Sequence, residues 1–164
     1  MRQMLPHPPS QILLLFANSD TVRVALEAQS EGGGPVPSFR EQRFPRARGS
    51  ARAVRQFVGD TLAGWGVSDR RDDMRLCASE MAANAVLHGA PPGREFAVRL
   101  AREQDGVWIE VRDSGPGRPV LWQPGSEAER GRGLWLVGVL ADEFEVREEV
   151  VGKTVRAGFK LAPG

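Results

Sequence analysis

The sequence predicts an α+β protein: a two-layer sandwich in which a mostly antiparallel sheet is covered by helices on one face. Three observations predict it, namely a long amphipathic helix over residues 69–89 and two strand pairs, 95–102 with 106–112 and 143–151 with 153–161. Short turns between paired strands make them antiparallel neighbours. Helices do not easily cover both faces of such a sheet, so we expect one layer of each.

Length and composition exclude several classes of protein. The 164 residues suit one domain, and 22 basic residues nearly balance 21 acidic ones, which leaves no global charge for binding nucleic acid or an anionic membrane. The lone Cys77 excludes an internal disulfide and favours a reducing, cytoplasmic setting, and two histidines are too few for a histidine-based metal cage. The longest apolar run, residues 12–17, is far short of the ~20 residues that span a bilayer.

The chain divides at about residue 37. Residues 1–37 contain a proline-broken start and a Gly- and Pro-rich stretch at 32–37, so we expect an N-terminal extension and linker whose role is unknown. An added strand or a partner-docking arm is the alternative. Residues 38–164 then form the domain.

The domain begins with a strand over residues 38–44, ended by Pro45, and a helix over 50–63 with Ser50 as its N-cap. Six arginines lie between residues 40 and 55 against one acid. A nucleic-acid patch is conceivable there, but no aromatic platform is interleaved on the helical part, so solvated charge is the preferred interpretation.

The helix over residues 69–89 carries two rows of side chains. Its apolar stripe comprises Met74, Cys77, Ala78, Met81, Ala82, Ala85 and Val86. Beside it, Glu80, Asn84 and His88 recur every four residues. Such a polar row usually faces solvent, but it can also face a ligand, and the helix alone leaves both interpretations open.

Two glycine-bearing segments bear on that choice. Asp113-x-Gly115-x-Gly117 follows a strand and is either an ordinary turn or an acceptor for an exocyclic amine, with glycines that admit a flat ring. Gly-Arg-Gly at 131–133 precedes an apolar helix over 134–141. It is either a flexible connection or a helix N-terminus open to phosphates.

Two other interpretations of these glycines fail on spacing. Residues 131–133 are not a dinucleotide fingerprint, because Leu136 takes the place of the third glycine and a loop precedes them. Gly-Lys-Thr at 152–154 is not a P-loop, because Arg147 stands where its first glycine belongs and the segment lies between two strands.

Taken in order, four motifs over residues 38–161 resemble the GHKL ATPase superfamily, which includes DNA gyrase, histidine kinases and mismatch-repair ATPases. The motifs are Glu80-x-x-x-Asn84, Asp113-x-Gly115-x-Gly117, Gly131-x-Gly133-Leu134 and Gly152-Lys153-Thr154. Within the superfamily the chain is most similar to the small stand-alone serine kinases that act as anti-sigma factors. The resemblance implies the histidine-kinase-like (Bergerat) fold.

The resemblance implies a role for each matching residue. Glu80 matches the general base, Asn84 the magnesium ligand and Asp113 the carboxylate that recognises adenine. The other matching positions are Gly115 and Gly117 beside the base, Gly131, Arg132, Gly133 and Leu134 at the phosphate-wrapping end of a lid, and Thr154, which helps to hold the base. Two features depart from the family pattern: Ala83 replaces a frequent hydroxyl residue, and the lid over 118–130 is short.

The implied function is an ATP- and Mg²⁺-dependent protein serine/threonine kinase in the cytoplasm. Its expected partners are a sigma factor, which it sequesters, and an antagonist protein, which it phosphorylates; a homodimer is expected from the family alone. The alternative is a non-catalytic, ATP-sensing module whose nucleotide sets its affinity for partners. An autophosphorylating histidine kinase is disfavoured, because His7 lies in a proline-rich stretch.

Overall fold

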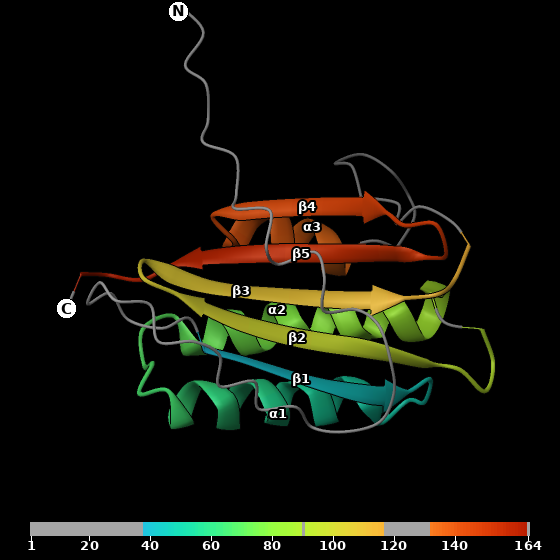
Figure 1. Ribbon diagram of the computed structural model, residues 1–164, viewed down its shortest axis with the longest axis horizontal. Helices are drawn as coiled ribbons and strands as arrows, with labels where there is room; N and C mark the ends of the chain where they lie inside the picture. The colour runs from blue at the N-terminus through green and yellow to red at the C-terminus, as the bar shows by residue number, and fades with distance from the viewer. Residues whose placement is uncertain (1–37, 90, 117–131, 164) are drawn as a thin grey trace, which may run out of the picture.

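One antiparallel sheet and a layer of helices make up the computed structural model, which describes residues 38–89, 91–116 and 132–163. The strands are β1 (Ser38–Pro45), β2 (Glu95–Glu103), β3 (Gly106–Asp113), β4 (Glu143–Glu148) and β5 (Lys153–Lys160). The helices are α1 (Ser50–Gly64), α2 (Arg71–Asn84), the π-helical turn η2 (Ala85–Gly89) and α3 (Arg132–Leu140). The strands follow the order β1-β2-β3-β5-β4, each pair antiparallel. The helices lie behind the sheet on one face (Figure 1), which confirms the α+β sandwich.

The core lies between the sheet and the helices because the strands alternate apolar and polar residues. In the three central strands the buried apolar side chains are Phe96, Val98, Leu100, Val107, Ile109, Val111, Val155, Ala157 and Phe159. Their neighbours in sequence point to the other face, where Arg156 stacks on Trp108 and pairs with Glu110 at 3.0 Å. The two-residue period therefore assigns one face of the sheet to the helices.

Helix α2 packs its apolar stripe against this sheet, as expected from its spacing. Met74, Cys77, Ala78, Met81 and Ala82 are buried. Burying a side chain of the size of methionine stabilises the fold by about 1.5–3 kcal/mol relative to its exposure. The stripe, and not helix propensity, holds α2 in place.

Both long helices begin differently from the sequence expectation. The prediction of Ser50 as an N-cap is wrong: Gly49 is the N-cap of α1, and the Ser50 hydroxyl donates to the Pro45 carbonyl at 2.5 Å. Helix α2 starts after Arg70, which has a left-handed backbone (φ 52°). The Arg70 guanidinium contacts Asp142 and the Leu140 carbonyl, and so ties the start of α2 to the end of α3.

The long helix is α-helical only as far as Asn84. Residues 85–89 form the π-helical turn η2, whose wider backbone ring redirects the chain at Gly89. Arg46, in the connection between β1 and α1, donates from Nε to the Val86 carbonyl at 2.7 Å. The hydrogen bond holds the turn against the end of the sheet that carries Asp113.

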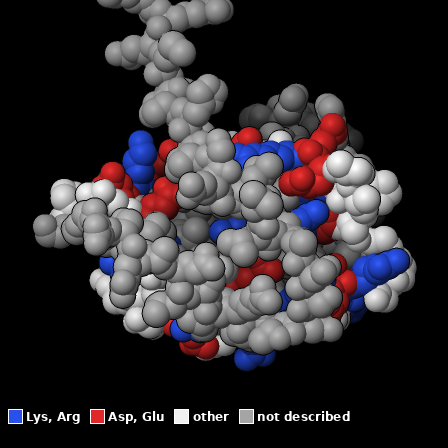
Figure 2. Space-filling view, viewed as in Figure 1, with Lys and Arg blue, Asp and Glu red and all other residues white. Residues whose placement is uncertain are grey.

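The visible surface of the described residues has no single sign of charge. Basic and acidic side chains lie side by side over the face turned to the viewer (Figure 2). Five of the six arginines between residues 40 and 55 are exposed, and Arg46 is half-buried. None of the helices in the described ranges is both long and apolar enough to cross a lipid bilayer.

Cys77 is expected to be inert in the folded protein. It is fully buried, and burial, with a smaller contribution from Asp73, raises the pKa of its thiol from 9.0 to about 12. Because the thiolate is the reactive form, iodoacetamide at pH 8 should leave the native protein unmodified and alkylate one thiol after denaturation. Mass spectrometry of both samples checks this, and rapid labelling of the native protein would contradict it.

Candidate functional site

Asp113 is the centre of a group of buried polar atoms at one end of the sheet. It ends β3, and its side chain is 1% exposed. Its Oδ1 accepts a hydrogen bond from the Gly115 amide at 2.9 Å and lies 3.2 Å from the Lys153 ammonium. The carboxylate is thus enclosed by its own turn and by the neighbouring strand β5.

Three glycines make this enclosure possible. A Cβ on Gly89 would lie 2.4 Å from Oδ2 of Asp113, and one on Gly115 would lie 1.4 Å from the Gly89 carbonyl oxygen. Gly152, at φ +82°, would place a Cβ 1.8 Å from the Asp113 carbonyl oxygen. No larger residue fits at these positions without movement of the backbone or the carboxylate.

Glu80 and Asn84 project from the last turns of α2 into the protein. A Cβ on Gly133 would lie 2.3 Å from Oε2 of Glu80, so the first turn of α3 lies directly against this carboxylate. Oδ1 of Asn84 is buried and has no hydrogen-bond partner within the described chain. His88, the next residue of the row, is exposed. Of the two interpretations of the polar row, the structure supports the inward one for Glu80 and Asn84.

The polar row and Asp113 belong to the same end of the molecule. Gly89 packs on the Asp113 carboxylate and follows Asn84 by five residues, which is about 8 Å of helical rise. The π-helical turn is therefore the connection that sets Asn84 and Glu80 at a fixed distance from Asp113.

The donor set around Asn84 fits a magnesium ion. Mg²⁺ is commonly held by one or two protein oxygens, with waters and substrate phosphates as its other ligands. A buried amide oxygen without a partner costs about 1–3 kcal/mol, which a bound cation would offset. Within the described ranges no three His, Cys, Asp or Glu residues converge on a point, so an all-protein metal cage is absent there.

The remaining residues of the predicted set are placed as follows. Arg132 is exposed at the start of α3, and Leu134 is buried in the core. Thr154 does not join the group around Asp113: its hydroxyl donates to Glu149 at 2.9 Å, on the sheet face away from the helices. Gly117, Gly131 and the lid over residues 118–130 lie outside the described residues.

Lys153 lies in this group and was not predicted. Its side chain is 2% exposed, and it points to the helix face together with Val155, Ala157 and Phe159. The signal that could have found it is the two-residue alternation of β5, which puts Lys153 and Thr154 on opposite faces.

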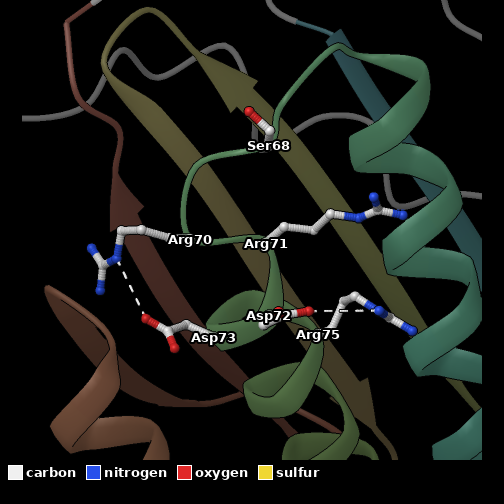
Figure 3. Close-up of a pocket in the computed structure, with 6 residues that line it drawn as sticks. All are labelled: Ser68, Arg70, Arg71, Asp72, Asp73 and Arg75. Carbon is white, nitrogen blue, oxygen red and sulfur yellow. Dashed lines mark ion pairs between the residues drawn. The ribbon is translucent and has the colours of Figure 1, made fainter.

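Two hollows in the described surface lie away from this group. One, of about 410 Å³, surrounds the start of α2 (Figure 3), where Arg70 pairs with Asp73 at 3.8 Å and Arg75 with Asp72 at 3.7 Å. Asn84 is thirteen residues further along, or about 20 Å of helix. The other, of about 580 Å³, lies between β1 and α1. Neither hollow is lined by Asn84 or Asp113, so the candidate site is defined by the buried polar atoms of these two residues and not by a hollow.

Gly89→Ala should destabilise the protein, because its methyl group would displace the Asp113 carboxylate. Overpacking of this kind costs about 1–3 kcal/mol in the free energy of unfolding. Gly138→Ala in α3 is the matched control, since a Cβ there meets nothing within 4 Å. Urea unfolding of both variants measures the difference, and equal stability would contradict the close approach.

Comparison with known proteins shows the family of the chain and a similar fold. The sequence model of a protein family, the histidine kinase-like ATPase domain, matches residues 44–159. No curated protein matches the chain. A solved structure of the RsbU and RsbW domains of Rv1364c from Mycobacterium tuberculosis is similar in fold, with a TM-score of 0.58 at 22% identity. The match covers 76% of this chain but about a third, 32%, of that one. The chain belongs to the histidine kinase-like ATPase domain family.

Proposed function

We propose that this protein binds ATP with Mg²⁺ and transfers the γ-phosphate to a serine or threonine hydroxyl of a partner protein. The observation that carries the proposal is the buried Oδ1 of Asn84, which has no hydrogen-bond partner among the described residues. It lies one helical turn from Glu80 and at the same end of the molecule as Asp113. Membership of the ATPase family supports the nucleotide.

The proposed roles divide between binding and chemistry. Oδ2 of Asp113 would accept a hydrogen bond from the exocyclic amine of adenine, and Asn84 would hold the metal through its amide oxygen. Magnesium bound there would neutralise charge on the phosphates. Gly133, in the first turn of α3, has no side chain, and its backbone amide would be available to the phosphates.

Glu80 is the proposed general base. It would accept the proton of the attacking hydroxyl as the new O–P bond forms and the bond between the β- and γ-phosphates breaks, with ADP as the leaving group. The Glu80 carboxylate is held against Gly133, which fixes its position relative to α3. Phosphoryl transfer depends mainly on such positioning and on charge neutralisation.

The proposed partners are a sigma factor, which the protein sequesters, and an antagonist, which it phosphorylates. The proposal rests on the resemblance of the four motifs to stand-alone anti-sigma-factor kinases. The similarity in fold to about a third, 32%, of the solved structure of the RsbU and RsbW domains of Rv1364c is compatible with it.

Asp113→Asn should weaken ATP binding, because the amide removes the anionic acceptor. A hydrogen bond to a charged group contributes about 1.5–3 kcal/mol, which corresponds to a roughly 10- to 150-fold loss of affinity. Titration calorimetry measures it, with circular dichroism to check folding. Asp105→Asn, in the exposed β2–β3 turn, is the control. Unchanged affinity in Asp113→Asn would remove the adenine assignment.

Glu80→Gln should retain ATP binding within a fewfold but slow phosphate transfer by about 10²- to 10⁴-fold, the usual contribution of a general base. Transfer from radiolabelled ATP to small antagonist proteins encoded beside the chain measures the effect, with Glu103→Gln on the exposed end of β2 as the control. A wild-type protein that binds ATP but labels none of these antagonists would favour the non-catalytic, ATP-sensing alternative.

A further inference from the structure

Lys153 is a fully buried lysine whose partner among the described residues is Asp113. Lysine is almost never fully buried unless it is paired. Its ammonium lies 3.2 Å from Oδ1 of Asp113, and both side chains are almost completely enclosed, at 2% and 1% exposure. An ion pair this deep forms only where its geometry offsets the cost of removing two charges from water.

The bonds around Asp113 are unequally divided between its two oxygens. Oδ1 accepts from both the Gly115 amide and the Lys153 ammonium. Oδ2 receives no hydrogen bond from any described residue, and the backbone of Gly89 packs beside it. The described residues therefore engage Oδ1, and Oδ2 is the oxygen that the proposed function assigns to the base.

The Lys153 ammonium has more N–H donors than acceptors among the described residues. A lysine ammonium has three N–H donors, and within the described part of the chain Oδ1 of Asp113 is the acceptor that it reaches. The pair thus sets an anionic acceptor and a cationic donor side by side. The edge of adenine that carries the 6-amino group has the complementary order, a donor at the amine next to an acceptor at ring nitrogen N1.

We propose that Lys153 is a specificity-determining residue of the nucleotide site, which donates a hydrogen bond to N1 of adenine while Oδ2 of Asp113 accepts from the 6-amino group. The inference rests on the proposed function, because it requires that Asp113 faces the base. Lys153 then has two effects: it holds the Asp113 carboxylate in one orientation, and it reads an atom of the base that Asp113 cannot read.

Wild-type protein tests the proposal without any substitution. Titration calorimetry compares Mg-ATP with 1-deaza-ATP, which lacks only the N1 acceptor, and with 7-deaza-ATP, which keeps N1. We expect 1-deaza-ATP to bind about 10-fold more weakly or worse, the loss of one charged hydrogen bond, and 7-deaza-ATP to bind within about threefold of ATP. Equal affinities for ATP and 1-deaza-ATP would overturn the proposal and leave ATP binding itself intact.

Lys153→Met separates base reading from a merely structural role. Loss of the ammonium should reduce the ratio of ATP affinity to 1-deaza-ATP affinity to near 1, whereas a structural lysine would weaken both ligands equally and leave the ratio unchanged. If the unpaired Asp113 unfolds this variant, the analogue series on the wild-type protein still decides. Failure of the proposed function differs from all of these outcomes, because the wild-type protein would then bind none of the nucleotides.

Discussion

The contact between Gly89 and the carboxylate of Asp113 joins the two layers of the molecule at the functional end. Gly89 ends the helical segment that carries Glu80 and Asn84, and Asp113 ends the central strand β3. A single methyl group at Gly89 would come within 2.4 Å of Oδ2, so the contact exists only with glycine there. The π-helical turn supplies the approach, because its wider ring brings the chain out of the α2 axis toward the sheet. Every distance between the polar row and Asp113 depends on this junction.

The same junction places a charged pair where most of the molecule is apolar. Asp113 and Lys153 are paired across β3 and β5, and their side chains point to the helices on the same face as Val111 and Val155. In a purely structural position, apolar residues of similar volume would serve as well or better, and removal of one partner would cost about 3–5 kcal/mol. The burial of both charges at this end is consistent with the proposed recognition of a polar ligand there.

Along α2 the apolar stripe and the polar row perform different tasks on the same helix. The stripe from Met74 to Ala82 is sealed against the sheet and holds the helix rigid. Glu80 and Asn84 lie near the end of the stripe, where α2 contacts α3 and η2. The proposed phosphate transfer requires precise positioning, because small displacements of a general base or a metal ligand lower the reaction rate.

By itself the sequence determined the class of the fold and the order of its elements, because periods of 2 and 3.6 residues are local properties that a buried face imposes on each segment. It also determined the family, through four short motifs in order. The tertiary structure decided which atoms meet. The Ser50 hydroxyl donates to the Pro45 carbonyl and does not cap the helix. Lys153 lies beside Asp113, whereas Thr154 bonds to Glu149. Such contacts depend on strand register and on the close approach of glycines distant in the chain, which no local pattern encodes.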